Sequence, residues 1–187
     1  MKIISKNRYI LFLILGIVAM ALMVPSIYSA VDRVKYFSSE ESEYFKYYCF
    51  QLVEYICIFM AELVFVIIGL RKQMTEPIVM TAAILYYASS ITFKIYDVIQ
   101  TSNYRYVFDI AIEILCLVTV VLALSKPSFL LSAIILLLID SAFNLANTFS
   151  GSTFGLSSLI LSAMLIFVVY FCCAKPDKDD LDSNIYS

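Results

Sequence analysis

Six apolar stretches, each long enough to cross a lipid bilayer, constrain the fold of this 187-residue chain more than any other feature. A transmembrane helix needs about 20 mainly apolar residues, and none of the stretches alternates apolar and polar residues as a barrel strand does. The sequence therefore predicts an all-α, polytopic integral membrane protein, a bundle of six transmembrane helices joined as up-down hairpins. The expected spans are residues 9–30, 48–70, 77–99, 106–124, 129–147 and 154–174.

These spans leave little chain for any other domain. We expect a single transmembrane domain over residues 1–174, followed by a short acidic tail over residues 175–187. The tail is polar and is expected to be disordered. It is too short to form a catalytic domain, so any signal would have to leave the protein through a partner.

The composition excludes several classes of function. The chain is 62% hydrophobic, whereas a soluble domain is usually about 45–50% apolar. It contains no histidine, which removes the imidazole general base and the imidazole metal ligand. A net charge of −2 provides no basic surface for nucleic acid. We find no catalytic constellation, and we expect no enzymatic activity, cofactor, metal site or nucleic-acid partner.

The distribution of Lys and Arg predicts the orientation of the bundle. Cytoplasmic loops of membrane proteins carry an excess of these residues. With an inside N-terminus, eight lie on the inner side and four on the outer side, so both termini are expected to be cytoplasmic in a multi-pass protein of the cell membrane. The inner set is Lys2, Lys6, Arg8, Arg71, Lys72, Lys126, Lys175 and Lys178, and the outer set is Arg33, Lys35, Lys46 and Arg105.

The first apolar stretch has an alternative interpretation as a signal peptide. Lys2, Lys6 and Arg8 resemble the charged start of such a peptide, and Ser29-Ala30 follows the apolar run. Tyr28 is bulky where a cleavage site needs a small residue, and this favours an uncleaved span. Cleavage would leave five spans and an outside N-terminus.

The charged residues inside the spans are the candidates for function. An ionisable side chain at the centre of a membrane helix costs about 2.5–3.5 kcal/mol on insertion scales, so it should face the bundle interior or water. Helical spacing places Lys94 and Asp97 on one face of the third span, and Asp140 and Asn144 on one face of the fifth. The candidate residues are Glu54, Glu62, Lys94, Asp97, Asp109, Glu113, Asp140, Asn144 and Asn147, with Arg105 at the rim.

Most of these residues fall in the outer half of their spans, which predicts a polar cavity that is open outward. Within one helix, Lys94 is expected to pair with Asp97, and Arg105 with Asp109. Some carboxyl groups then have no local cation, which suits the binding of a cation or a proton. The alternative is a structural one, in which these groups pair between helices and only hold the bundle together.

A weak internal repeat accompanies these charges. Residues 77–126 align with residues 127–175 without a gap. The alignment places Ser90 on Asp140, Lys94 on Asn144 and Asp97 on Asn147. Apolar composition does not generate coincidences of polar residues, and parallel repeats occur in some transporters.

Two main classes of function follow from the sequence, and a membrane enzyme that uses carboxylates alone is a third and less favoured class. The first is binding or transport of a small molecule or cation at the carboxylate-rich cavity. The second is a non-enzymatic membrane accessory, sensor or immunity protein that acts through a membrane protein partner. In both cases the lipid bilayer is the surrounding solvent, and the first case implies a small cationic or polar ligand.

Overall fold

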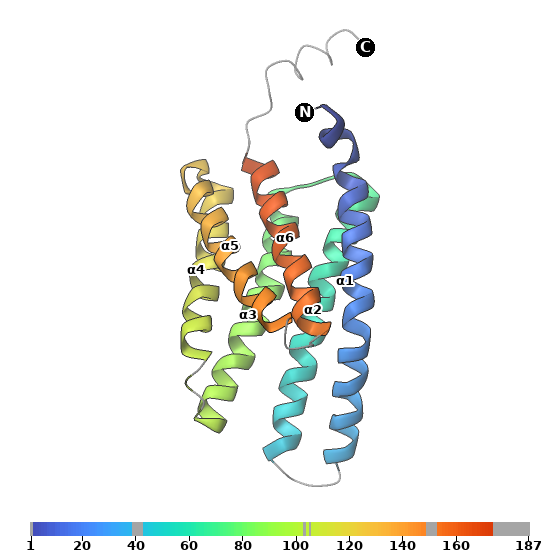
Figure 1. Ribbon diagram of the computed structural model, residues 1–187, viewed down its shortest axis with the longest axis vertical. Helices are drawn as coiled ribbons and strands as arrows, with labels where there is room; N and C mark the ends of the chain where they lie inside the picture. The colour runs from blue at the N-terminus through green and yellow to red at the C-terminus, as the bar shows by residue number, and fades with distance from the viewer. Residues whose placement is uncertain (1, 39–42, 103, 105, 149–152, 174–187) are drawn as a thin grey trace.

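The computed structural model describes residues 2–38, 43–102, 104, 106–148 and 153–173, with side chains described from residue 9 and excepting 43, 147, 148 and 153. These residues contain helices and no strand. Figure 1 shows the helices side by side. They are α1 (Lys2–Phe37), α2 (Glu43–Arg71), α3 (Glu76–Thr101), α4 (Tyr106–Ser125), the short 3₁₀ helix η1 (Pro127–Phe129), α5 (Leu130–Thr148) and α6 (Thr153–Cys173).

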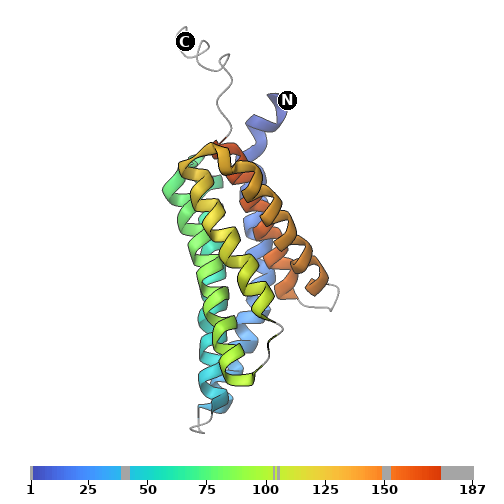
Figure 2. The same ribbon diagram turned by 90° about the vertical axis from the view of Figure 1, so that its left-hand side faces the viewer.

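The six α-helices are long and apolar enough to cross a membrane, which confirms the predicted fold class. Each helix contains most or all of its predicted span, and α1 and α2 extend several residues beyond theirs. The start of α1 and the end of α6 lie at one end of the bundle, and the end of α1 and the start of α2 lie at the other (Figures 1 and 2). We call this second end the α1–α2 end. Which end faces the cytoplasm stays a prediction.

Local backbone chemistry explains where the helices begin and end. Pro77 lies in the first turn of α3, where its missing N–H would have had no helical partner. Lys72 and Ser102 adopt the left-handed conformation, with φ of 52° and 53°, directly after α2 and α3. A left-handed residue at this position is a common helix terminator. These residues end α2 and α3, and the chain then leads into the next helix of the bundle.

Helix α6 has the most central position, since it contacts each of the other five helices. Its residues Leu161, Met164, Leu165 and Val168 are fully buried. The other helices follow one another around it, from α1 to α5. In a bilayer, where lipid is as apolar as leucine, close packing of this kind must hold the helices together.

The pair α1–α2 packs most closely, and two glycines permit it. A Cβ atom on Gly69 would lie 2.7 Å from the Cβ and N atoms of Leu13, and one on Gly16 would lie 2.8 Å from Cγ2 of Val66. Real side chains cannot approach so closely, so only glycine fits there. The two contacts also define the antiparallel register, in which residue 69 lies opposite residue 13 and residue 66 opposite residue 16.

The three hairpins have different lengths at the α1–α2 end. The end of α6 that carries Phe154 stops beside the middle of the bundle, whereas α1 and α2 continue well past it (Figure 1). The rings of Phe154 and Tyr55 lie 5.0 Å apart between centroids, which places the first turn of α6 at the level of Tyr55. Tyr55 is twelve residues into α2, so α2 extends about 18 Å beyond this level.

Candidate functional site

Five of the six predicted intramembrane carboxylates are buried in the bundle. Asp109 and Asn144 are half-buried, and Lys94 has a side chain that is 20% exposed. Arg105 and the side chain of Asn147 lie outside the described residues, so the expected Arg105–Asp109 pair stays a prediction. The buried group, each at most 5% exposed, comprises Glu54, Glu62, Asp97, Glu113 and Asp140.

Lys94 and Glu113 form an ion pair between α3 and α4. The Nζ atom of Lys94 lies 2.6 Å from Oε1 of Glu113, and the hydroxyl of Ser90 donates to the same oxygen at 2.9 Å. This is the only ion pair among the described residues. The expected pairing of Lys94 with Asp97 is wrong, because α4 runs antiparallel to α3 and brings a more deeply placed carboxylate within reach. An unpaired Glu113 would be costly at this depth.

Asp140 is held by neutral donors instead of a cation. Its Oδ2 atom accepts hydrogen bonds from the hydroxyls of Ser162 at 2.8 Å and Tyr87 at 3.2 Å, and from the amide of Asn144 at 3.3 Å. The Asn144 amide also donates to the hydroxyl of Tyr86 at 3.1 Å. These contacts join α3, α5 and α6. Helical spacing places Tyr87 on the same face of α3 as Ser90 and Lys94, and we call this face the polar stripe of α3, but spacing does not show that Tyr86 or Ser162 joins the network.

The two networks face each other across a very small space. This space, about 10 Å³, has room for about one water molecule. The polar faces of α3, α4 and α5 therefore pack against one another, and they leave only this small space between them. The residues around the space are Lys94, Asp109, Ile112, Glu113, Asp140, Phe143 and Asn144.

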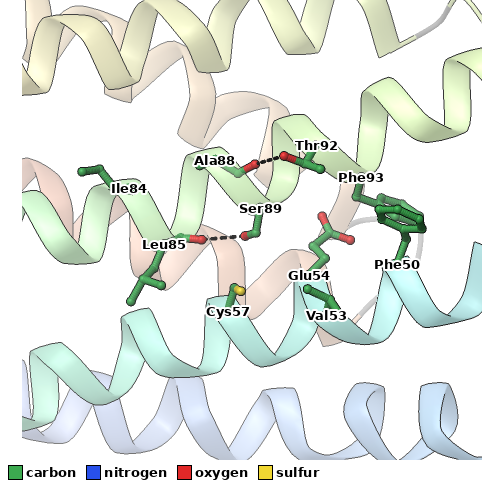
Figure 3. A pocket seen from close by; sticks show the side chains of 10 residues that line it. All are labelled: Phe50, Val53, Glu54, Cys57, Ile84, Leu85, Ala88, Ser89, Thr92 and Phe93. Carbon is green, nitrogen blue, oxygen red and sulfur yellow. Dashed lines mark hydrogen bonds between the residues drawn. The ribbon is translucent and has the colours of Figure 1, made fainter.

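A larger space lies on the other side of α3, beside Glu54. A groove of about 290 Å³ runs between α2 and α3, and Figure 3 shows the side chains that line it. The Glu54 carboxyl points from α2 toward α3, between Ser89 and Phe93. Ser90, Lys94 and Glu113 lie near enough to influence the charge of Glu54. The groove therefore reaches the edge of the network that these three residues form. The lining residues are Phe50, Val53, Glu54, Cys57, Ile84, Leu85, Ala88, Ser89, Thr92 and Phe93.

The walls of this groove are mainly apolar, and the hydroxyls of Ser89 and Thr92 already donate hydrogen bonds within α3. Ser89 donates to the carbonyl of Leu85 at 2.6 Å, and Thr92 donates to the carbonyl of Ala88 at 2.7 Å. Both bonds stay within α3, as hydroxyls in membrane helices often do. Glu54 is therefore the one ionisable oxygen ligand that the described lining offers.

Glu62 does not belong to this cluster. It lies two turns further along α2 and faces α6, where Ser157 donates a hydrogen bond to its Oε1 atom. Its Oε2 atom and the hydroxyl of the neighbouring Ser158 are buried without a hydrogen-bond partner among the described residues. The sequence places Glu62 inside a span, but it does not show which neighbouring helix the side chain faces.

The hydrogen bonds of the two hairpins α3–α4 and α5–α6 correspond to each other. Ser90 and Lys94 on α3 both contact Glu113 on α4. Fifty residues later, Asp140 and Asn144 on α5 both contact Ser162 on α6. Ser162 is offset by one residue from the position equivalent to Glu113. The contacts thus follow the polar coincidences of the sequence repeat.

Comparisons with protein-family models, with curated proteins and with solved structures return no match for this chain.

Proposed function

We propose that the protein binds an amphipathic organic cation inside the membrane, in the groove between α2 and α3. The observation that carries this proposal is an apolar groove of about 290 Å³ with one buried carboxylate, Glu54, in its lining. Ligand pockets typically combine apolar walls with a few polar groups that fix orientation, and their volumes begin near 300 Å³. The size suits a small amine that carries one aromatic or branched apolar group.

The charge balance around Glu54 favours a cation over an anion. Glu54, Glu113 and Asp140 lie around one ammonium group, that of Lys94, and Lys94 is already paired with Glu113. Burying an additional carboxylate in the membrane without a counter-charge is unfavourable. A ligand ammonium beside Glu54 would supply that charge.

The apolar walls favour an organic cation over an inorganic one. The side chains of Phe50, Ile84 and Leu85 offer no oxygen ligands, whereas hard metal cations such as Mg²⁺ are bound by several oxygen atoms. They do offer apolar surface, and burial of apolar surface contributes about 25 cal/mol per Å². Phe50 and Phe93 also present aromatic rings, which attract quaternary ammonium groups.

A pair of matched probes tests this proposal. Benzyltrimethylammonium and neopentylbenzene have the same shape, and only the first carries a charge. We expect benzyltrimethylammonium to raise the thermal unfolding temperature of the purified protein, and neopentylbenzene to raise it much less. In Glu54→Gln the stabilisation by the cation should disappear, whereas Glu76→Gln, an exposed acid at the start of α3, should keep it.

Equal stabilisation by the two probes would show that the protein does not recognise the positive charge. Retained stabilisation in Glu54→Gln would show that Glu54 does not bind the cation. A protein that is silent to both probes but co-purifies with a stable protein partner would instead favour the accessory or sensor function.

A further inference from the structure

A second cavity lies on the opposite face of α2, where α6 ends early. It measures about 230 Å³ and opens between α1, α2 and the first turn of α6. Glu54 faces α3, whereas Gln51 and Tyr55, four residues apart, face this notch. The notch is therefore separate from the groove of the proposed function. Its lining residues are Pro25, Ser26, Ser29, Ala30, Arg33, Gln51, Tyr55 and Phe154.

The lining of the notch is rich in hydrogen-bond donors and carries a positive charge. Arg33 supplies a guanidinium group, and Gln51, Tyr55 and Ser29 supply an amide and hydroxyls. No Asp or Glu is among the lining residues, and no carboxylate forms an ion pair with Arg33 in the described part of the chain. This chemistry is the reverse of that around Glu54, so it suits an anion.

Arg33 is already held in position by an aromatic ring. Its Cζ atom lies 5.4 Å from the centroid of the Tyr48 ring. A cation–π contact of this kind uses none of the guanidinium N–H groups as hydrogen-bond donors to the ring edge, so they remain for an oxygen ligand. A planar fork of donors matches two oxygens of a phosphate group.

The register of α1 and α2 gives the depth of Arg33. Residue 69 lies opposite residue 13 and residue 66 opposite residue 16, so residue 33 lies at the level of residue 49 on α2. If the end of α2 at Arg71 marks one boundary of a hydrocarbon core of about 30 Å, the other boundary falls at about Gln51. Arg33 then lies roughly 3 Å outside the core, in the layer of lipid headgroups.

We propose that this notch binds the phosphate group of an anionic phospholipid, with Arg33 as its principal contact and Gln51 and Tyr55 as further donors. The position at headgroup depth favours a lipid phosphate over one from solution. The absence of a carboxylate from the described lining favours an anionic headgroup over a zwitterionic one, because the notch offers nothing to a choline ammonium.

Native mass spectrometry of the protein released from bilayers tests the lipid. We expect phosphatidylglycerol to be retained more strongly than phosphatidylcholine by the wild type. Arg33→Gln should weaken retention by about tenfold or more, as expected for the loss of a charge-assisted pair. Lys35→Gln removes the same charge from an exposed position on the same helix and should leave retention unchanged. Arg33→Lys should retain part of the preference.

Circular dichroism melting of each variant shows whether it remains folded, and Arg33→Lys keeps the test valid if Arg33→Gln does not fold. A loss in Arg33→Gln no larger than that in Lys35→Gln would overturn the site. Equal retention of the two lipids would overturn the preference for an anionic headgroup. Inorganic phosphate forms the third arm. If it stabilises the wild type but not Arg33→Gln, and no lipid is preferred, the ligand is a soluble phosphate and the lipid assignment is wrong.

Discussion

The ion pair between Lys94 and Glu113 permits the most detailed prediction, because its two members are unequally buried. The side chain of Lys94 is 20% exposed and that of Glu113 is 5% exposed. Removal of one member of a buried pair usually costs about 3–5 kcal/mol, since the other charge stays buried without its partner. We therefore expect the two single substitutions to destabilise the protein by different amounts.

Lys94→Met should be the more damaging change. It leaves the carboxylate of Glu113 with only the hydroxyl of Ser90 as a donor, and we expect a loss of about 3 kcal/mol in the free energy of unfolding. Glu113→Gln should cost about 1–2 kcal/mol, because the neighbouring Glu54 still provides a negative charge for Lys94. The double variant buries no unpaired charge, so it should be less destabilised than Lys94→Met alone.

Reversible unfolding in mixed micelles, followed by circular dichroism, measures these differences as a double-mutant cycle. Contacting residues show interaction energies of about 0.5–3 kcal/mol, whereas independent residues add within about 0.5 kcal/mol. Additive effects of the two substitutions would refute the interpretation that this pair bridges α3 and α4. A double variant less stable than Lys94→Met would refute the charge argument itself.

Two further predictions concern other helix contacts. Gly69→Ala should destabilise the protein by about 1–3 kcal/mol, because its methyl group would meet backbone atoms of α1, whereas Leu70→Ala, at an exposed position, should have little effect in the same unfolding assay. Ser157→Ala should cost about 1–3 kcal/mol, because Glu62 loses its hydrogen bond. Ser89→Ala should be nearly neutral in the same assay, and equal effects of the two substitutions would contradict the buried Ser157–Glu62 contact.

The sequence predicts the helices well because the membrane imposes a simple rule on them. About 20 apolar residues are needed for each crossing, and an apolar run of that length is visible without knowledge of its neighbours. Helical periodicity also predicts that Tyr87, Ser90 and Lys94 share a face of α3. All three side chains lie in the polar networks of the structure.

What the sequence does not show is how one helix is rotated and shifted against another. Periodicity alone cannot decide whether Lys94 reaches Asp97 on its own helix or Glu113 on the next. It also cannot show that Glu62 faces α6 while Glu54 faces α3. Gly16 and Gly69 are isolated glycines in two apolar runs, and only the crossing of α1 and α2 shows that both are needed.

The two cavities depend on the same three-dimensional information. The groove beside Glu54 lies between α2 and α3, and small or branched side chains such as Ala88 and Val53 are part of its lining. The notch beside Arg33 exists because α6 begins near the level of Tyr55. Neither cavity can be predicted from the length or the hydropathy of a single span.

The affinity of benzyltrimethylammonium for a set of charge variants, measured by isothermal titration calorimetry, tests whether Glu54 binds an organic cation. A cation beside Glu54 is attracted by that carboxylate and by Glu113, and it is repelled by Lys94. We therefore predict the tightest binding in Lys94→Met, followed by the wild type and Glu113→Gln, with no measurable binding in Glu54→Gln. An affinity in Glu54→Gln equal to that of the wild type would show that Glu54 does not bind the cation.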